Sequence, residues 1–215
     1  MKLLNRAVLL VTAAMFISPI RLYATIAMVF IPWIGLILAC SSKGRITIDV
    51  QRRRPTVLLA IGIPAMAMLF LPKTGYLYHL AYFWLPFTGI ILCMAFALAF
   101  IAFKGGIDRR RNEVKFIIGV YAVLLPLYAT NAVLQCNARF DRSQPIYYTT
   151  TVLQKSQASG KASGHYFTLS PWLPTITEET IDVSASMYQQ TAENSQLRVC
   201  HRAGWLGIPW YTVQP

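Results

Sequence analysis

The sequence predicts a bundle of about five transmembrane α-helices followed by a small all-β domain, a barrel or sandwich of about five strands. Composition is the first observation: of 215 residues, 55% are hydrophobic and only 13% are charged, with a mean hydropathy of +0.46. Soluble domains carry roughly a quarter of their residues as charges, so this balance argues against a soluble or disordered chain. The second observation is a change near Cys136 from long apolar runs to short alternations.

The apolar runs have the lengths that membrane spans require, because a hydrocarbon core of about 30 Å needs about 20 helical residues. Residues 7–40 form one run, which as a single helix would be about 50 Å long. We expect this run to reverse at Pro19 and Arg21, and a single tilted span is the alternative. The predicted spans are residues 4–20, 22–40, 55–72, 80–103 and 116–135.

The positive charge is concentrated in the membrane half of the chain. Residues 1–136 hold fourteen Lys and Arg against three acids, a net charge of +11, whereas residues 137–215 hold six against five, a net charge of +1. Alternate loops carry twelve of the fourteen bases, and only Arg21 and Lys73 fall on the other side. The positive-inside rule therefore predicts a multi-pass membrane protein with a cytoplasmic N-terminus and a C-terminal domain outside the cytoplasm. This placement of the charge argues against a nucleic-acid partner.

Two arginine triplets flank predicted spans on the cytoplasmic side. We interpret them first as topology signals and second as a site of contact with anionic lipid, where each base contributes about 1 kcal/mol. The residues are Arg52, Arg53, Arg54, Arg109, Arg110 and Arg111.

Acidic residues are missing from the predicted spans, and Arg21 and His79 fall at their ends, although transporters and proton relays usually keep ionisable residues inside. Prolines do interrupt the apolar runs, and kinked helices can surround a substrate cavity. A small-solute or lipid-handling transporter is therefore the alternative to a protein without transport activity. The prolines are Pro32, Pro64, Pro86 and Pro126.

The C-terminal part, residues 137–215, alternates apolar and polar residues with the period of two that is typical of half-buried strands. A small-residue segment at 156–164 predicts a hairpin turn, and residues 186–192 predict one helical turn. The predicted strands are residues 146–155, 165–170, 180–184, 196–200 and 208–213. Strands of this number and length suit a small antiparallel barrel or sandwich.

The chemistry-bearing residues of this domain predict no catalytic site, metal or cofactor. Cys200 and His201 are neighbours on a predicted strand, so their side chains point to opposite faces and do not share a metal. Cys136 and Cys200 both fall on the predicted oxidising side, and a disulfide between them is expected to contribute about 4 kcal/mol. A buried position for Cys136 at the bilayer edge is the alternative.

The C-terminal residues resemble a family of small multi-span bacterial inner-membrane proteins of uncharacterised activity, whose periplasmic tails end in a similar Gly-x-Leu-Gly-x-Pro-Trp run. The resemblance rests on Ile181-Asp182-Val183-Ser184, Tyr188, Leu197-Arg198-Val199 and Gly204-Trp205-Leu206-Gly207-Ile208-Pro209-Trp210-Tyr211, with Asn137 and Asp141 after the last span. The chain departs from the pattern at Asn194-Ser195, where such tails show Gly-Asp. The resemblance implies the architecture and a bacterial inner-membrane location with a periplasmic or extracellular C-terminal domain, and it implies no activity.

Three aromatic residues near the C-terminus, Trp205, Trp210 and Tyr211, form a candidate binding face. Packing in the core or against the bilayer surface is the alternative, because an aromatic ring with one polar atom suits an interface. We expect a non-enzymatic accessory or interaction component of a membrane assembly, with the lipid bilayer and other membrane or periplasmic proteins as partners.

Overall fold

The computed structural model describes residues 2–14, 17, 20–48, 56–69, 77–105, 112–158 and 164–215. The chain divides into two compact units. A helical unit comprises Met1–Pro72 and Ala81–Arg139, and a β unit comprises Lys73–Leu80 and Phe140–Pro215. The sequence-based boundary after residue 136 lies three residues before the division after Arg139.

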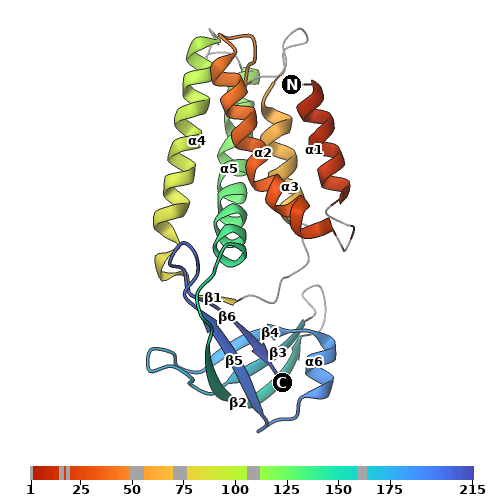
Figure 1. Ribbon diagram of the computed structural model, residues 1–215, viewed down its shortest axis with the longest axis vertical. Helices are drawn as coiled ribbons and strands as arrows, with labels where there is room; N and C mark the ends of the chain where they lie inside the picture. The colour runs from red at the N-terminus through yellow and green to blue at the C-terminus, as the bar shows by residue number, and fades with distance from the viewer. Residues whose placement is uncertain are drawn as a thin grey trace. The chain divides into compact units, whose positions relative to one another are not determined.

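The described part of the helical unit contains five α-helices, joined to the β unit's first strand by a short 3-10 helix, η2 (Leu80–Tyr82). The α3 helix packs against α1, α2 and α5, and α4 packs against α2 and α5 (Figure 1). The buried side chains between these helices are almost all apolar. The helices are α1 (Lys2–Ala14), α2 (Arg21–Ser41), α3 (Leu58–Leu69), α4 (Trp84–Lys104) and α5 (Asn112–Arg139).

Three described helices are long and apolar enough to cross a membrane, namely α2, α4 and α5. They correspond to the predicted spans at 22–40, 80–103 and 116–135. The described residues give three spanning helices where five were predicted, because α1 has 13 residues and α3 has 12. At 1.5 Å per residue, these helices are only about 20 Å long, less than the thickness of a bilayer core.

Local hydrogen bonds explain why two of the predicted spans are shorter helices. After Ala14 the backbone tightens, since the Ile17 N–H donates to the Ala14 carbonyl at 3.1 Å and the Ile20 N–H to the Ile17 carbonyl at 3.2 Å. Each of these bonds joins residues three apart in the sequence, as in a 3-10 helix, instead of four apart. The α-helical hydrogen bonds of the predicted span at 4–20 therefore do not continue past this point. The predicted span at 55–72 begins as helix only at Leu58, whose N–H is capped by the Thr56 hydroxyl at 3.1 Å.

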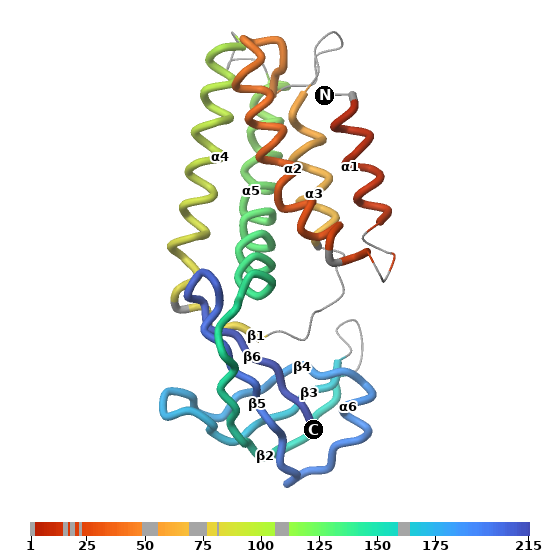
Figure 2. Tube along the Cα trace, in the orientation of Figure 1, coloured from red at the N-terminus to blue at the C-terminus, as the bar shows by residue number. Residues whose placement is uncertain are grey.

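The β unit is a curled antiparallel sheet of six strands, a half-barrel, with the order β1-β6-β5-β2-β3-β4 (Figures 1 and 2). The strands are β1 (Leu77–Tyr78), β2 (Ile146–Ala158), β3 (Gly164–Leu169), β4 (Glu179–Val183), β5 (Gln196–Arg202) and β6 (Trp210–Gln214). All five strands predicted from the alternation are present, and the hairpin of β2 and β3 is confirmed. The sixth strand, β1, comes from the segment between α3 and α4, which the sequence pattern did not predict.

One face of this sheet is buried. The β5 residues Leu197 and Val199 point to it, and Val152 on β2, Phe167 on β3 and Ile181 on β4 complete its core, each at most 3% exposed. Successive strand residues alternate between faces, so the residues between them lie on the outer face.

The predicted helical turn is present as α6 (Ala185–Gln190), which packs near β3. Ser184 caps its N-terminus by accepting a hydrogen bond from the Met187 N–H at 3.2 Å. Lys155 on β2 holds its C-terminal end, because the ammonium donates to the carbonyls of Tyr188 and Thr191 at 2.6 Å each. The lysine thereby satisfies carbonyls that the helix itself leaves unpaired.

Candidate functional site

The carboxylate of Asp141 joins the segment after α5 to the segment that leads into β6. Its Oδ1 accepts from the Ser143 N–H at 2.7 Å, a local turn typical of Asp. Its Oδ2 accepts from the Gly204 N–H at 3.0 Å and from Nε1 of Trp210 at 2.7 Å. Asp141 therefore fixes two segments that are about sixty residues apart in the sequence.

Ser143 adds two more bonds to this junction. Its carbonyl accepts from the Arg202 guanidinium at 2.8 Å, and its hydroxyl accepts from the Ala203 N–H at 3.2 Å. These hydrogen bonds surround the Asp141 carboxylate with rigid neighbours. We refer to Asp141, Ser143, Arg202, Gly204 and Trp210 as the Asp141 junction.

The hydrogen-bond donors around Asp141 determine the direction in which the pKa of its carboxyl is shifted. Burial on its own would raise the pKa of the carboxyl, but the hydrogen bonds from Ser143, Trp210 and Gly204 outweigh it, and the net pKa lies below its ordinary value. A carboxylate that accepts several hydrogen bonds stays ionised. Asp141 is therefore a structural anion and is not suited to act as a proton donor.

The turn beyond the junction holds Trp205 outward. Gly204 and Gly207 have φ angles of +80° and +72°, which favour glycine, and the Gly207 N–H donates to the Gly204 carbonyl at 3.1 Å. Trp205 occupies the second position of this turn and is 58% exposed. Its ring meets the ring of Phe140 edge to face, with the centroids 5.5 Å apart.

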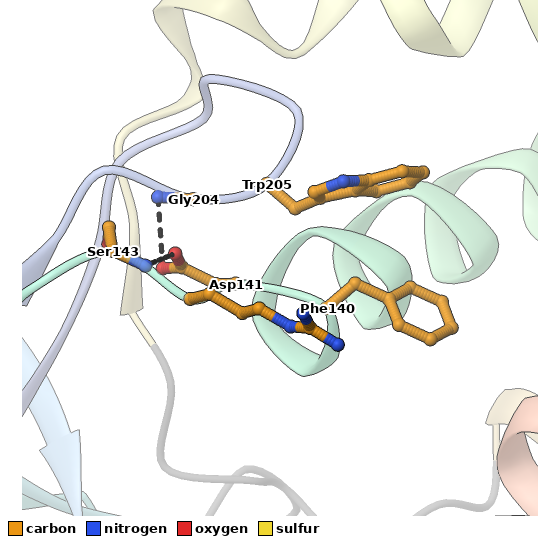
Figure 3. Close-up of a pocket in the computed structure, with 6 residues that line it drawn as sticks. Phe140, Asp141, Ser143, Gly204 and Trp205 are labelled. Atoms are coloured by element: carbon orange, nitrogen blue, oxygen red, sulfur yellow. Dashed lines mark hydrogen bonds between the residues drawn. The ribbon is translucent and has the colours of Figure 1, made fainter.

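A surface pocket of about 450 Å³ lies at this turn. Figure 3 shows the Asp141 carboxylate facing Gly204 and Ser143, while the rings of Trp205 and Phe140 extend away from it on one side. The pocket thus combines a fixed backbone with two aromatic rings and an exposed cation. The lining residues are Phe140, Asp141, Arg142, Ser143, Gly204 and Trp205.

The outer face of the sheet carries a second surface pocket, of about 340 Å³, over β2 and β5. The guanidinium of Arg198 stacks on the ring of Tyr147 with its central carbon 4.0 Å from the ring centroid. Tyr147 is 50% exposed and pairs with Cys200 of β5. We call Tyr147, Thr149, Gln196 and Arg198 the outer patch.

The inner face holds a cluster of five rings, His79, Tyr148, Trp172, His201 and Tyr211, which we call the histidine–aromatic cluster. The register places Tyr211 opposite both Leu77 of β1 and His201 of β5. Trp172 comes from the β3–β4 connection. Its ring centroid lies 4.9 Å from that of Tyr211 and 6.0 Å from that of either histidine. The rings are therefore packed against one another.

Several polar atoms of this cluster are buried without a hydrogen-bond partner among the described residues. They are His79 Nε2, Trp172 Nε1 and His201 Nδ1. Burial, and to a smaller extent the nearby Glu179 carboxylate, raises the pKa of Tyr211. Burial, followed by repulsion from His79, lowers the pKa of His201, so that His201 is neutral at pH 7. The buried inner face of the sheet therefore contains an uncharged imidazole, that of His201.

The three predicted aromatic site residues do not form one exposed face. Trp210 and Tyr211 are 7% and 1% exposed and follow one another on β6, so they point to opposite sides of the strand. Trp210 belongs to the Asp141 junction, and Tyr211 belongs to the histidine–aromatic cluster. Only Trp205 is presented to the outside.

The predicted disulfide is not formed, because Cys136 and Cys200 are free thiols, as are Cys40 and Cys93. Cys136 lies on α5 and packs against the apolar core of the helical unit, whereas Cys200 lies on β5. Cys136 is half-buried, and the predicted alternative, a position at the bilayer edge, stays a prediction. Both arginine triplets lie outside the described residues, so their predicted lipid contact stays a prediction.

In the described part of the chain, no group of three or more His, Cys, Asp or Glu side chains is arranged to hold a metal ion. Comparisons with protein-family models, with characterised proteins and with solved structures give no match.

Proposed function

We propose that this chain is a non-enzymatic membrane protein that displays its β unit outside the cytoplasm as a binding module of a membrane assembly. The outer patch carries this proposal. Tyrosine and arginine are enriched among the residues that dominate protein interfaces, and Tyr147 and Arg198 lie exposed on paired strands. Rigid strands hold both side chains in place, so binding would require little ordering.

The apolar outside of the helical unit supports the membrane location. Large apolar side chains point away from the core along α4, with Leu85, Phe96 and Phe103 at least 76% exposed. Soluble proteins rarely expose such a surface, but a lipid-facing helix requires it. With the basic connection between α4 and α5, residues 104–115, as the orientation signal, we propose a cytoplasmic N-terminus and a periplasmic or extracellular β unit.

The test is a photo-reactive amino acid at position 147 of the full chain in bacterial membranes. We expect one discrete protein cross-link at position 147, and we expect Arg198→Ala to weaken it by roughly 30-fold, the effect of losing one dominant interface residue. The matched control places the photo-reactive group at Gln189, which is exposed on α6.

Equal cross-linking from positions 147 and 189, or a product that Arg198→Ala leaves unchanged, would contradict a specific outer patch. The thermal stability of the Arg198→Ala protein must match that of the wild type, because a misfolded β unit would also lose the product. Arg198 makes its contact on an exposed face, so we expect the match.

The alternative, a small-solute or lipid-handling transporter, would need a polar-lined cavity in the helical unit. The described groove among α1, α3 and α5 has a volume of about 410 Å³ and a lining in which Thr12 is the one polar side chain. Its apolar lining favours the binding module over a small-solute transporter.

A further inference from the structure

The exposed ring of Trp205 is held in a fixed position on the β unit. The Gly204–Gly207 turn that carries it is fixed by the Asp141 junction, so its 58% exposure does not come from a loose loop. Phe140 supports the ring from one side, and exposed Arg142 lies in the same pocket. The surface therefore presents two aromatic rings and a cation together.

The position of Phe140 in the chain indicates what lies next to this surface. Phe140 directly follows Arg139, the last residue of α5, and the apolar part of α5 ends at Gln135. Four further residues at 1.5 Å each rise about 6 Å beyond the hydrocarbon core. The headgroup layer on each side of a bilayer is roughly 5–8 Å thick, so the helix delivers Phe140 to the level of the headgroups.

The chemistry of the surface matches that layer. Tryptophan is enriched at membrane interfaces because its ring is apolar and its N–H is polar, and arginine pairs with lipid phosphates. The acid within the pocket does not oppose this, because both oxygens of Asp141 accept hydrogen bonds from Ser143, Gly204 and Trp210.

We propose that Phe140, Arg142 and Trp205 form an interfacial anchor that inserts into the headgroup layer of the outer leaflet. This inference rests on the proposed membrane location of α5. The anchor ties the turn before β6 to the bilayer at the point where the chain leaves the membrane. The outer patch is separate from it and stays available to a partner protein.

The test uses tryptophan quenching in the full chain, reconstituted into vesicles of phosphatidylethanolamine and phosphatidylglycerol. The vesicles contain lipid with a nitroxide either on the headgroup or at carbon 12 of the acyl chain. The fluorescence lost on Trp205→Phe isolates the signal of Trp205. We expect the headgroup nitroxide to quench this signal at least about twofold more than the acyl-chain nitroxide.

Trp33→Phe supplies the control, because Trp33 lies near the middle of the apolar α2 helix. Its signal should show the opposite order, with stronger quenching from carbon 12. If Trp33 is quenched as expected while Trp205 is quenched by aqueous iodide and by neither lipid, the anchor is refuted and the membrane location stands. If neither lipid quenches Trp33, the membrane location fails, and the anchor fails with it.

Discussion

Replacing Asp141 by alanine tests how much the Asp141 junction stabilises the β unit. The change removes the acceptor for the N–H groups of Ser143 and Gly204 and for Nε1 of Trp210. Trp210 is 7% exposed, so loss of this acceptor costs about 1–3 kcal/mol, and the two half-buried backbone groups add about 0.5 kcal/mol each because water reaches them. We expect a loss of about 2–4 kcal/mol in the stability of the β unit.

Hydrogen exchange of the detergent-solubilised full chain measures this loss where it occurs. Amides in residues 203–214 should exchange roughly 30- to 700-fold faster, since every 1.4 kcal/mol is a factor of ten. Asp141→Asn keeps the shape but turns an amide nitrogen towards a donor, so its effect should be intermediate. Because the folded pKa of Asp141 lies below its ordinary value, its contribution is complete above about pH 4 and declines as the pH falls further.

Glu178→Ala is the matched control, since Glu178 is an exposed acid of the β3–β4 connection. We expect it to change stability by less than about 0.5 kcal/mol. Exchange in the Asp141→Ala protein equal to that of the control would refute the reasoning, because it would mean that the three hydrogen bonds contribute nothing.

Three further predictions concern other parts of the chain. The pKa of His201 is lowered in the folded state, so the unfolded chain takes up a proton first, and the β unit should lose stability as the pH falls below about 6.5. Urea unfolding at pH 7.5 and 5.5 should show this loss, and His201→Gln should reduce it. A β unit that is more stable at pH 5.5 than at pH 7.5 would contradict the prediction. Gly35→Ala should destabilise the helical unit by about 1–3 kcal/mol in a thermal melt, because its new Cβ would lie 2.8 Å from the Cβ of Ala60; Gly89→Ala, with no atom within 4 Å, is the control and should not destabilise it. Alkylation of the unfolded chain without reductant should add four groups. Addition of only two groups would show one disulfide and contradict the four free thiols.

The strands of the β unit could be predicted because their alternation comes directly from burial on one face. Leu197 and Val199 point inward on β5 while Arg198 points outward, and this pattern is readable in a single sequence. The same reasoning missed β1, whose two residues, Leu77 and Tyr78, gain their place only by pairing with β6. A strand of two residues is too short to have a period.

The helices were located correctly, but two of their lengths were not. Hydropathy marks where a run is apolar, whereas the end of a helix depends on hydrogen bonds such as those at Ile17 and Thr56. The predicted spans at 22–40 and 116–135 lie inside the longer helices α2 and α5. The first residues of the predicted span at 80–103 form the 3-10 helix η2, and α4 begins only at Trp84.

The candidate sites were the least predictable part of the molecule. Asp141 and Trp210 are 69 residues apart, and only the folded sheet brings the carboxylate to the indole N–H. His79, from a connection between helices, meets His201 through β1, with ring centroids 6.1 Å apart. The outer patch gave no sequence signal, because Tyr147 and Arg198 look like ordinary strand residues. Trp205 was the one predicted aromatic site residue that the structure leaves exposed.

The helical unit is proposed to anchor the chain in a membrane and to present the β unit outside the cytoplasm. The most direct test of this topology compares two fusions of the full chain after Pro215 in a bacterial host, one to alkaline phosphatase and one to green fluorescent protein. Alkaline phosphatase requires export to become active, whereas green fluorescent protein exported unfolded does not fluoresce. We predict a membrane-bound, active phosphatase fusion and a dark fluorescent-protein fusion, and a fluorescent, phosphatase-inactive pair would contradict the account.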